Sequence, residues 1–133
     1  MKKQSRRAFL TGTSLLAVGV TTSSLASPIA NAPLIHHVFF WLKNPSSKED
    51  TERLIEGIQT LKKIETMQEF RIGLPAKTPK RDVIDDTYAV SLFTTFKDVD
   101  GHNVYQEHAI HKKFIKNYSN LWAKVQVYDS MDV

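Results

Sequence analysis

Residues 34–42 read Leu-Ile-His-His-Val-Phe-Phe-Trp-Leu, and this stretch constrains the fold of the chain more than any other. β-branched and aromatic residues are frequent in it, which predicts a β-strand. Side chains alternate between the two faces of a strand, and both faces here are mainly apolar, with Val38 and Phe40 on one and Phe39 and Trp41 on the other. Both faces must therefore be covered. In a domain of about 100 residues, helices can cover one face, so we expect a second copy of the chain to cover the other and form a homodimer through the sheet.

The remaining elements follow in an order that predicts the fold class. Ser47 has the position of an N-cap, and the helix after it is expected to extend to about Ile64, with Leu54, Ile58 and Leu61 as its buried stripe. Further strands are expected over 67–72, 88–96 and 122–128, a second helix over 100–118, and an exposed polar loop over 76–86. This β-α-β-β-α-β order is that of the ferredoxin-like α+β sandwich.

The second expected helix carries the residues most indicative of chemistry. Positions 104, 108, 111, 115 and 118 form one helical stripe, and His108 and His111 occupy it where a core helix would carry Leu or Ile. Tyr105 lies one turn before His108. An inward-facing tyrosine and two inward-facing histidines are costly to bury unless they find partners or line a cavity. We therefore expect the site at these three residues, and place His37 and His102 on other faces, without a role.

The first 26 residues have the layout of an export signal. The segment begins with four basic residues and contains no acidic one. An uncharged stretch over 8–26 follows, and the segment ends in small residues. Residues 5–10, Ser-Arg-Arg-Ala-Phe-Leu, resemble the twin-arginine export signature. We predict export to the periplasm or the medium, with cleavage after Ala26 or, as a second choice, after Ala32. The predicted organisation is a signal over 1–26, a short leader over 27–33 and one domain over 34–133.

Charge and cysteine content narrow the partners of the mature chain. The whole chain has 18 basic and 14 acidic residues, and the signal holds four of the basic ones, so 18 less 4 leaves 14 of each. A net charge of zero gives no reason to expect a nucleic acid or an anionic membrane as partner. The chain has no cysteine, which excludes disulfides, thiol catalysis and thiolate metal sites.

Several short motifs in this order resemble the stress-responsive A/B barrel (Dabb) family. They are residues 36–43, His-His-Val-Phe-Phe-Trp-Leu-Lys; residues 70–73, Phe-Arg-Ile-Gly; the run Tyr105-x-x-His108-x-x-His111; and residues 125–130, Val-Gln-Val-Tyr-Asp-Ser. The resemblance extends from about Leu34 to Ser130. It implies small ferredoxin-like domains that pair through their sheets into a dimeric α/β barrel.

The resemblance also implies a site. One member is the plant olivetolic acid cyclase, which closes a polyketide into an aromatic ring by a cofactor-free aldol step. Its catalytic tyrosine and histidine match Tyr105 and His111, and a pocket histidine matches His36. The chain departs from the family at Ala109, where the family usually has proline. It departs from the cyclase at Val90, where the cyclase has a further pocket histidine. We expect a differently shaped pocket, lined by His36, His108, Val38, Phe40 and Val90.

The chemistry that these residue types support is proton transfer beside a carbonyl group. A histidine with a pKa near 6.5 can act as the base and a tyrosine hydroxyl can donate to the enolate oxygen, so we expect His111 as base and Tyr105 as donor, with no metal and no cofactor. Three alternatives stay open: a ligand-binding or structural module whose histidines are satisfied core residues, a metal site at His108 and His111 with His36 or Glu107, and a haem-type monooxygenase.

Overall fold

The computed structural model describes residue 19, residues 25–27 and residues 32–133. The predicted export signal lies largely outside these residues, and the signal and both cleavage sites stay predictions. The elements in chain order are β1 (Leu34–Leu42), α1 (Lys48–Thr60), the 3-10 turn η1 (Leu61–Lys63), β2 (Met67–Gly73), β3 (Val90–Phe96), α2 (Val99–Glu107), α3 (Ala109–Tyr118), the 3-10 turn η2 (Ser119–Leu121) and β4 (Trp122–Met131).

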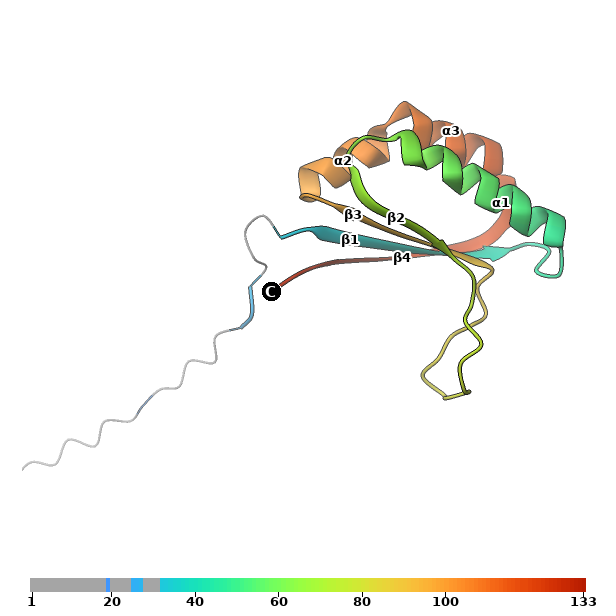
Figure 1. Ribbon diagram of the computed structural model, residues 1–133, viewed down its shortest axis with the longest axis horizontal. Coiled ribbons are helices and arrows are strands. Elements are labelled where there is room, and N and C mark those ends of the chain that lie inside the picture. Colours follow the sequence, from blue (N-terminus) through green and yellow to red (C-terminus); the bar gives the residue numbers. More distant parts are fainter. Residues whose placement is uncertain (1–18, 20–24, 28–31) are drawn as a thin grey trace, which may run out of the picture.

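The four strands form one antiparallel sheet in the order β2-β3-β1-β4, with the helices packed on one of its faces (Figure 1). β1, the strand predicted from residues 34–42, lies between β3 and β4. This arrangement is the ferredoxin-like α+β fold, so the predicted fold class is confirmed. Figure 1 also shows the long β2–β3 connection projecting on the side of the sheet that faces away from the helices.

The core lies between the sheet and the helices. Alternate residues of β1, from Leu34 to Leu42, are buried there, while the residues between them are only half-buried. The predicted stripe of α1 is confirmed, because Leu54, Ile58 and Leu61 are fully buried. The N-cap is confirmed too, since the backbone N–H of Asp50 donates to Ser47 Oγ at 3.1 Å.

The opposite face of the sheet carries an aromatic cluster, and we call it the outer face. His37, Phe39, Tyr88, Phe93 and Tyr128 form this cluster. Ring centroids within it lie 4.3 Å apart for His37 and Phe39 and 4.9 Å apart for Phe39 and Tyr88. Tyr128 keeps 62% of its surface exposed. No helix of residues 32–133 covers this face (Figure 1).

The single helix expected over 100–118 is two helices. His108 has an extended backbone, with φ −63° and ψ 139°, so it ends α2. Its Nδ1 then accepts a hydrogen bond from the backbone N–H of Ile110 at 3.1 Å, which caps α3. A histidine can satisfy a free N–H of a helix start with its side chain, and this local bond favours the break over a continuous helix.

The break also changes which residues face the core. Val104 and Ile115, which a continuous helix would bury, are 47% and 40% exposed. Tyr105 and Phe114 are buried in their place. Within residues 25–27 and 32–133, none of the helices has the length and apolar character that crossing a membrane requires.

Candidate functional site

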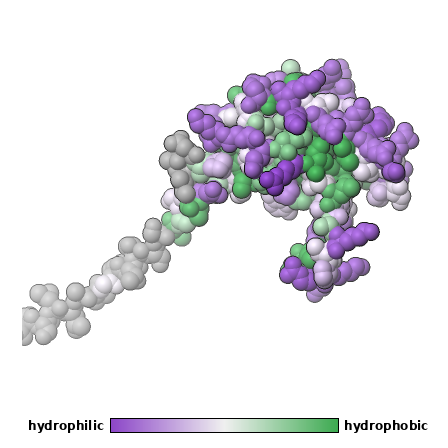
Figure 2. Space-filling model, viewed as in Figure 1, coloured by the Kyte–Doolittle hydropathy of each residue, from purple (hydrophilic) through white to green (hydrophobic). Residues whose placement is uncertain are grey.

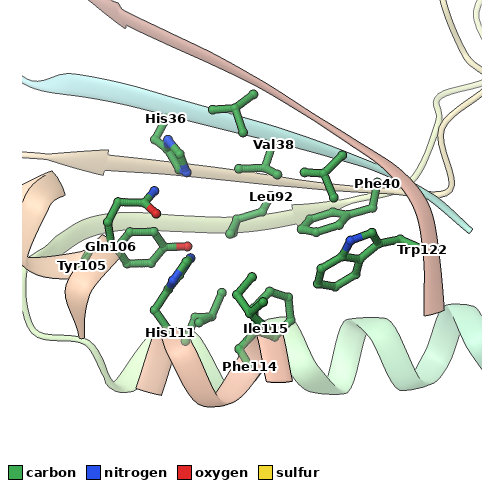
Figure 3. A pocket seen from close by; sticks show the side chains of 13 residues that line it. His36, Val38, Phe40, Leu92, Tyr105, Gln106, His111, Phe114, Ile115 and Trp122 are labelled. Atoms are coloured by element: carbon green, nitrogen blue, oxygen red, sulfur yellow. The ribbon is translucent and has the colours of Figure 1, made fainter. Parts of the chain in front are cut away.

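A cavity of about 180 Å³ lies between the sheet and the helices (Figure 3). Its polar end is formed by His36 of β1, Tyr105 and Gln106 of α2, and His111 of α3. The rest of its wall is apolar, and the space-filling view shows apolar surface gathered between the helices and the sheet, below a hydrophilic helical surface (Figure 2). The apolar lining residues are Val38, Phe40, Leu61, Leu92, Phe114, Ile115, Trp122, Val125 and Val127.

Tyr105 extends from α2 with its hydroxyl directed into the cavity (Figure 3). The residue is 2% exposed, and this burial raises the pKa of its hydroxyl above the usual value of 10. The phenol therefore stays protonated across the physiological range. It is available as a hydrogen-bond donor to an oxygen atom in the cavity.

His111 lies in the first turn of α3, beside the tyrosine. The ring centroids of Tyr105 and His111 are 4.7 Å apart. Burial lowers the pKa of His111, the nearby His36 lowers it further, and the backbone carbonyl of Gln106 opposes both effects. His111 is therefore neutral at pH 7 and can accept a proton.

His36 is held by Asp129, which lies directly opposite it on β4. The distance from His36 Nδ1 to Asp129 Oδ1 is 2.6 Å. Burial lowers the pKa of His36 against the raising effect of the carboxylate, so the contact at pH 7 is a hydrogen bond from a neutral imidazole rather than an ion pair. Because Nδ1 donates to Asp129, Nε2 is the nitrogen that the ring can present to the cavity.

The structure brings together His36, Tyr105 and His111, but not His108. The expectation that His108 points inward with His111 was wrong, because His108 caps α3 and does not line the cavity. Its Nε2 lies 3.6 Å from a carboxylate oxygen of Glu65 instead. This geometry also argues against a metal site at His108 and His111, because only His111 faces the cavity.

Of the three apolar residues expected to line the pocket, two do so and one does not. Val38 and Phe40 line the cavity. Val90 does not, because it is fully buried in the core next to Phe40, its partner across the β1–β3 register.

Sequence reasoning missed two neighbours of His36. Asp129 was beyond the expected end of the last strand, at residue 128, and only the register of β1 against β4 could have found it. His102 was expected on another face, yet its ring centroid lies 4.9 Å from that of His36. The signal available was its spacing of three residues from Tyr105, which places both side chains on one side of α2.

The sequence profile of the family described as "Stress responsive A/B Barrel Domain" matches residues 34–132. Among curated protein sequences, none matches the chain at a significant level.

Solved structures give the same fold. A Dabb family protein from Mesorhizobium loti has 22% identity and a TM-score of 0.63, over 77% of this chain and 98% of its own. A hydroxynitrile lyase from Passiflora edulis has 19% identity and a TM-score of 0.65, over 78% and 96%. A protein from Thermobifida fusca, described as a dimeric ferredoxin-like protein of unknown function, has 14% identity and a TM-score of 0.61, over 77% and 92%. With its fold and nearly all of its described residues matched, the chain belongs to the stress-responsive A/B barrel domain family.

Proposed function

We propose that this protein is an exported, homodimeric enzyme that makes or breaks a carbon–carbon bond beside a carbonyl group of a small, mostly apolar substrate, without a cofactor. The observation that carries the proposal is the pairing of a neutral His111 with a protonated Tyr105 at the polar end of an otherwise apolar cavity. One group can accept a proton and the other can donate a hydrogen bond, and both face the same space.

The roles follow from the protonation states. In the direction of bond formation, His111 removes a proton from the carbon beside a carbonyl, and Tyr105 donates a hydrogen bond to the enolate oxygen that forms. The enolate carbon then attacks a second carbonyl, and the resulting alkoxide takes the proton back from His111. No electrons leave the substrate, so the step needs neither an oxidant nor a reductant. Bond cleavage is the same sequence reversed.

His36 supports this chemistry from the opposite wall. Asp129 fixes the orientation of its ring, so Nε2 can accept a hydrogen bond from a substrate hydroxyl or from an ordered water. The apolar wall excludes water, which strengthens each of these polar interactions. A lyase among the solved structures of this fold, from Passiflora edulis, agrees with the class of reaction.

The homodimer is supported by the outer face. In one chain its aromatic cluster is only partly buried, with Tyr128 exposed, and it is large enough to be costly in water. Two copies packed through this face would cover both clusters and close a barrel between the sheets. A structural neighbour from Thermobifida fusca is described as dimeric, which agrees with this packing.

A direct test uses aromatic β-hydroxy ketones, whose cleavage releases an aromatic aldehyde that absorbance can follow. We expect the full-length chain to release aldehyde above the buffer rate. We expect Tyr105→Phe and His111→Gln each to reduce kcat/KM roughly 100-fold or more. His108→Asn, which keeps a capping side chain outside the cavity, is the matched control and should retain activity.

The second candidate is a ligand-binding module that performs no reaction, and the largely apolar wall of the cavity favours it. This candidate predicts saturable binding of an aromatic ketone or aldehyde that His111→Gln leaves unchanged, with no product formed. That result would exclude the proposed enzyme and support the ligand-binding module.

A further inference from the structure

We propose that His36, His102 and Asp129 form a binding site for one divalent transition-metal ion of the Zn²⁺ class. Each residue offers one ligand atom, and the three atoms lie within 4.8 Å of one another. The site adjoins the polar end of the cavity and shares only His36 with its lining. Its existence does not depend on the proposed reaction, because it needs neither Tyr105 nor His111, which carry that reaction.

Three separate elements bring the ligands together. His36 comes from β1, Asp129 from the facing position of β4, and His102 from the first turns of α2. A tetrahedral zinc site with bonds of about 2.0–2.1 Å places its ligand atoms about 3.4 Å apart. The observed spacing therefore needs only small side-chain movements, which the exposed Asp129 can make.

The ligand set and its surroundings suit this class of ion. Two imidazole nitrogens and one carboxylate oxygen are the donors of many zinc sites, and a fourth position stays open for water. Asp129 has a side chain that is 44% exposed, which gives the ion a route from solvent. Within the described part of the chain, the only basic group within ion-pair distance of this carboxylate is His36, so no lysine or arginine competes with a cation.

The two histidines are held in place before an ion arrives. The buried His36 contacts Asp129 at 2.6 Å and has its ring centroid 4.9 Å from that of His102. Gln106, one turn further along α2, places its amide nitrogen 3.4 Å from His102 Nε2 and restrains that ring. Restraint of this kind reduces the entropy lost on binding.

The ion would also change which nitrogen of His36 carries the proton. In the metal-free protein, Nδ1 donates to Asp129. An ion bound at Nδ1 displaces that proton, and a neutral ring then carries its hydrogen at Nε2. The ¹⁵N shifts of this side chain report the change of tautomer directly.

The test uses the full-length chain without a polyhistidine tag and Co²⁺ as a visible probe of Zn²⁺ sites. We expect one Co²⁺ per chain, visible ligand-field bands that Zn²⁺ abolishes, and a change in His36 tautomer on addition of Zn²⁺. We expect His102→Gln and Asp129→Asn, which keep the size of the side chains, each to weaken binding at least tenfold. His108→Asn, at a histidine outside the group, should bind as the unmodified chain does.

Two results would overturn the proposal. One is the absence of saturable binding at one ion per chain. The other is equal affinity in the unmodified chain, His102→Gln and Asp129→Asn, since the ion would then lie elsewhere. Circular dichroism of each variant separates a lost ligand from a lost fold. Aldehyde release from β-hydroxy ketones by the metal-free chain tests the proposed reaction separately, so the two proposals can fail independently.

Discussion

The rings of Tyr105 and His111 lie 4.7 Å apart between centroids and are inclined by 59°, although the two residues belong to different helices. The bend at His108 produces this arrangement, because it turns α3 relative to α2 and brings its first turn beside Tyr105. At pH 7 the tyrosine is protonated and burial keeps the histidine neutral, so the pair has one donor and one acceptor.

The first prediction concerns pH. The pKa of His111 is lowered from 6.5 by burial, so the base form is already dominant at pH 7 and is lost only as the pH falls through that lowered value. We expect kcat/KM for β-hydroxy ketones to be level above neutral pH and to decline only at pH values below the ordinary histidine pKa of 6.5. A profile that rises toward acid would contradict the role of His111 as base.

The second prediction concerns the contact between α1 and α3. A Cβ atom at Gly57 would lie 2.6 Å from Cγ of Tyr118, which is closer than van der Waals contact allows. We expect Gly57→Ala to lower the free energy of unfolding by about 1–3 kcal/mol, measured by urea denaturation. The double variant Gly57→Ala, Tyr118→Ala removes the clash, so the cost of the alanine should disappear in that background. Where no clash occurs, alanine stabilises a helix relative to glycine by up to about 1 kcal/mol. A Gly57→Ala variant that is more stable than the unmodified chain would therefore show that the two helices have room for a methyl group.

The third prediction concerns the outer face. Phe39→Lys places a charge within the aromatic cluster, and burying it unpaired against a second copy is costly. We expect the unmodified chain to have the mass of a dimer in light scattering after size exclusion. We expect Phe39→Lys to raise the dissociation constant of the dimer at least tenfold. Gln59→Lys, on the exposed side of α1, should leave the mass unchanged. A monomeric unmodified chain at micromolar concentration would exclude the homodimer.

The fourth prediction concerns the N-terminus. The paired arginines are Arg6 and Arg7. We expect the chain expressed in a bacterium to be recovered from the periplasm with Ser27 as its first residue, by mass spectrometry. Replacing both arginines by lysine should retain the precursor inside the cell, although the charge is unchanged. Equal export of the two forms would exclude the twin-arginine route.

The sequence predicted the fold well because the information is local. The run of β-branched and aromatic residues over 34–42 predicted the strand, and the stripe of Leu54 and Ile58 predicted the buried face of α1; both agree with the structure. Strand ends were less accurate, since the last strand extends to Met131 rather than residue 128. Polar edge residues carry little periodic signal.

The site was harder to predict because it joins residues that lie far apart in the sequence. Tyr105 and His111 lie six residues apart, and the motif that contains both indicated a shared site. His108 was misplaced because a periodic pattern assumes an unbroken helix, whereas a side-chain cap can end one. Asp129 is 93 residues from His36, and only the pairing of β1 with β4 makes them neighbours.

That pairing places Asp129, which orients His36, on an exposed strand. β4 is an edge strand, most of its residues are exposed, and Asp129 stands two residues before its end. Edge strands and their ends open by local fluctuation at a small fraction of the cost of unfolding the whole domain. Amide hydrogens near Asp129 are therefore expected to exchange faster than those of β1, and each opening event releases His36 while the core stays folded. The orientation of His36 is then governed by the local fraying equilibrium of one strand, and a variant can lose it while its melting temperature stays the same.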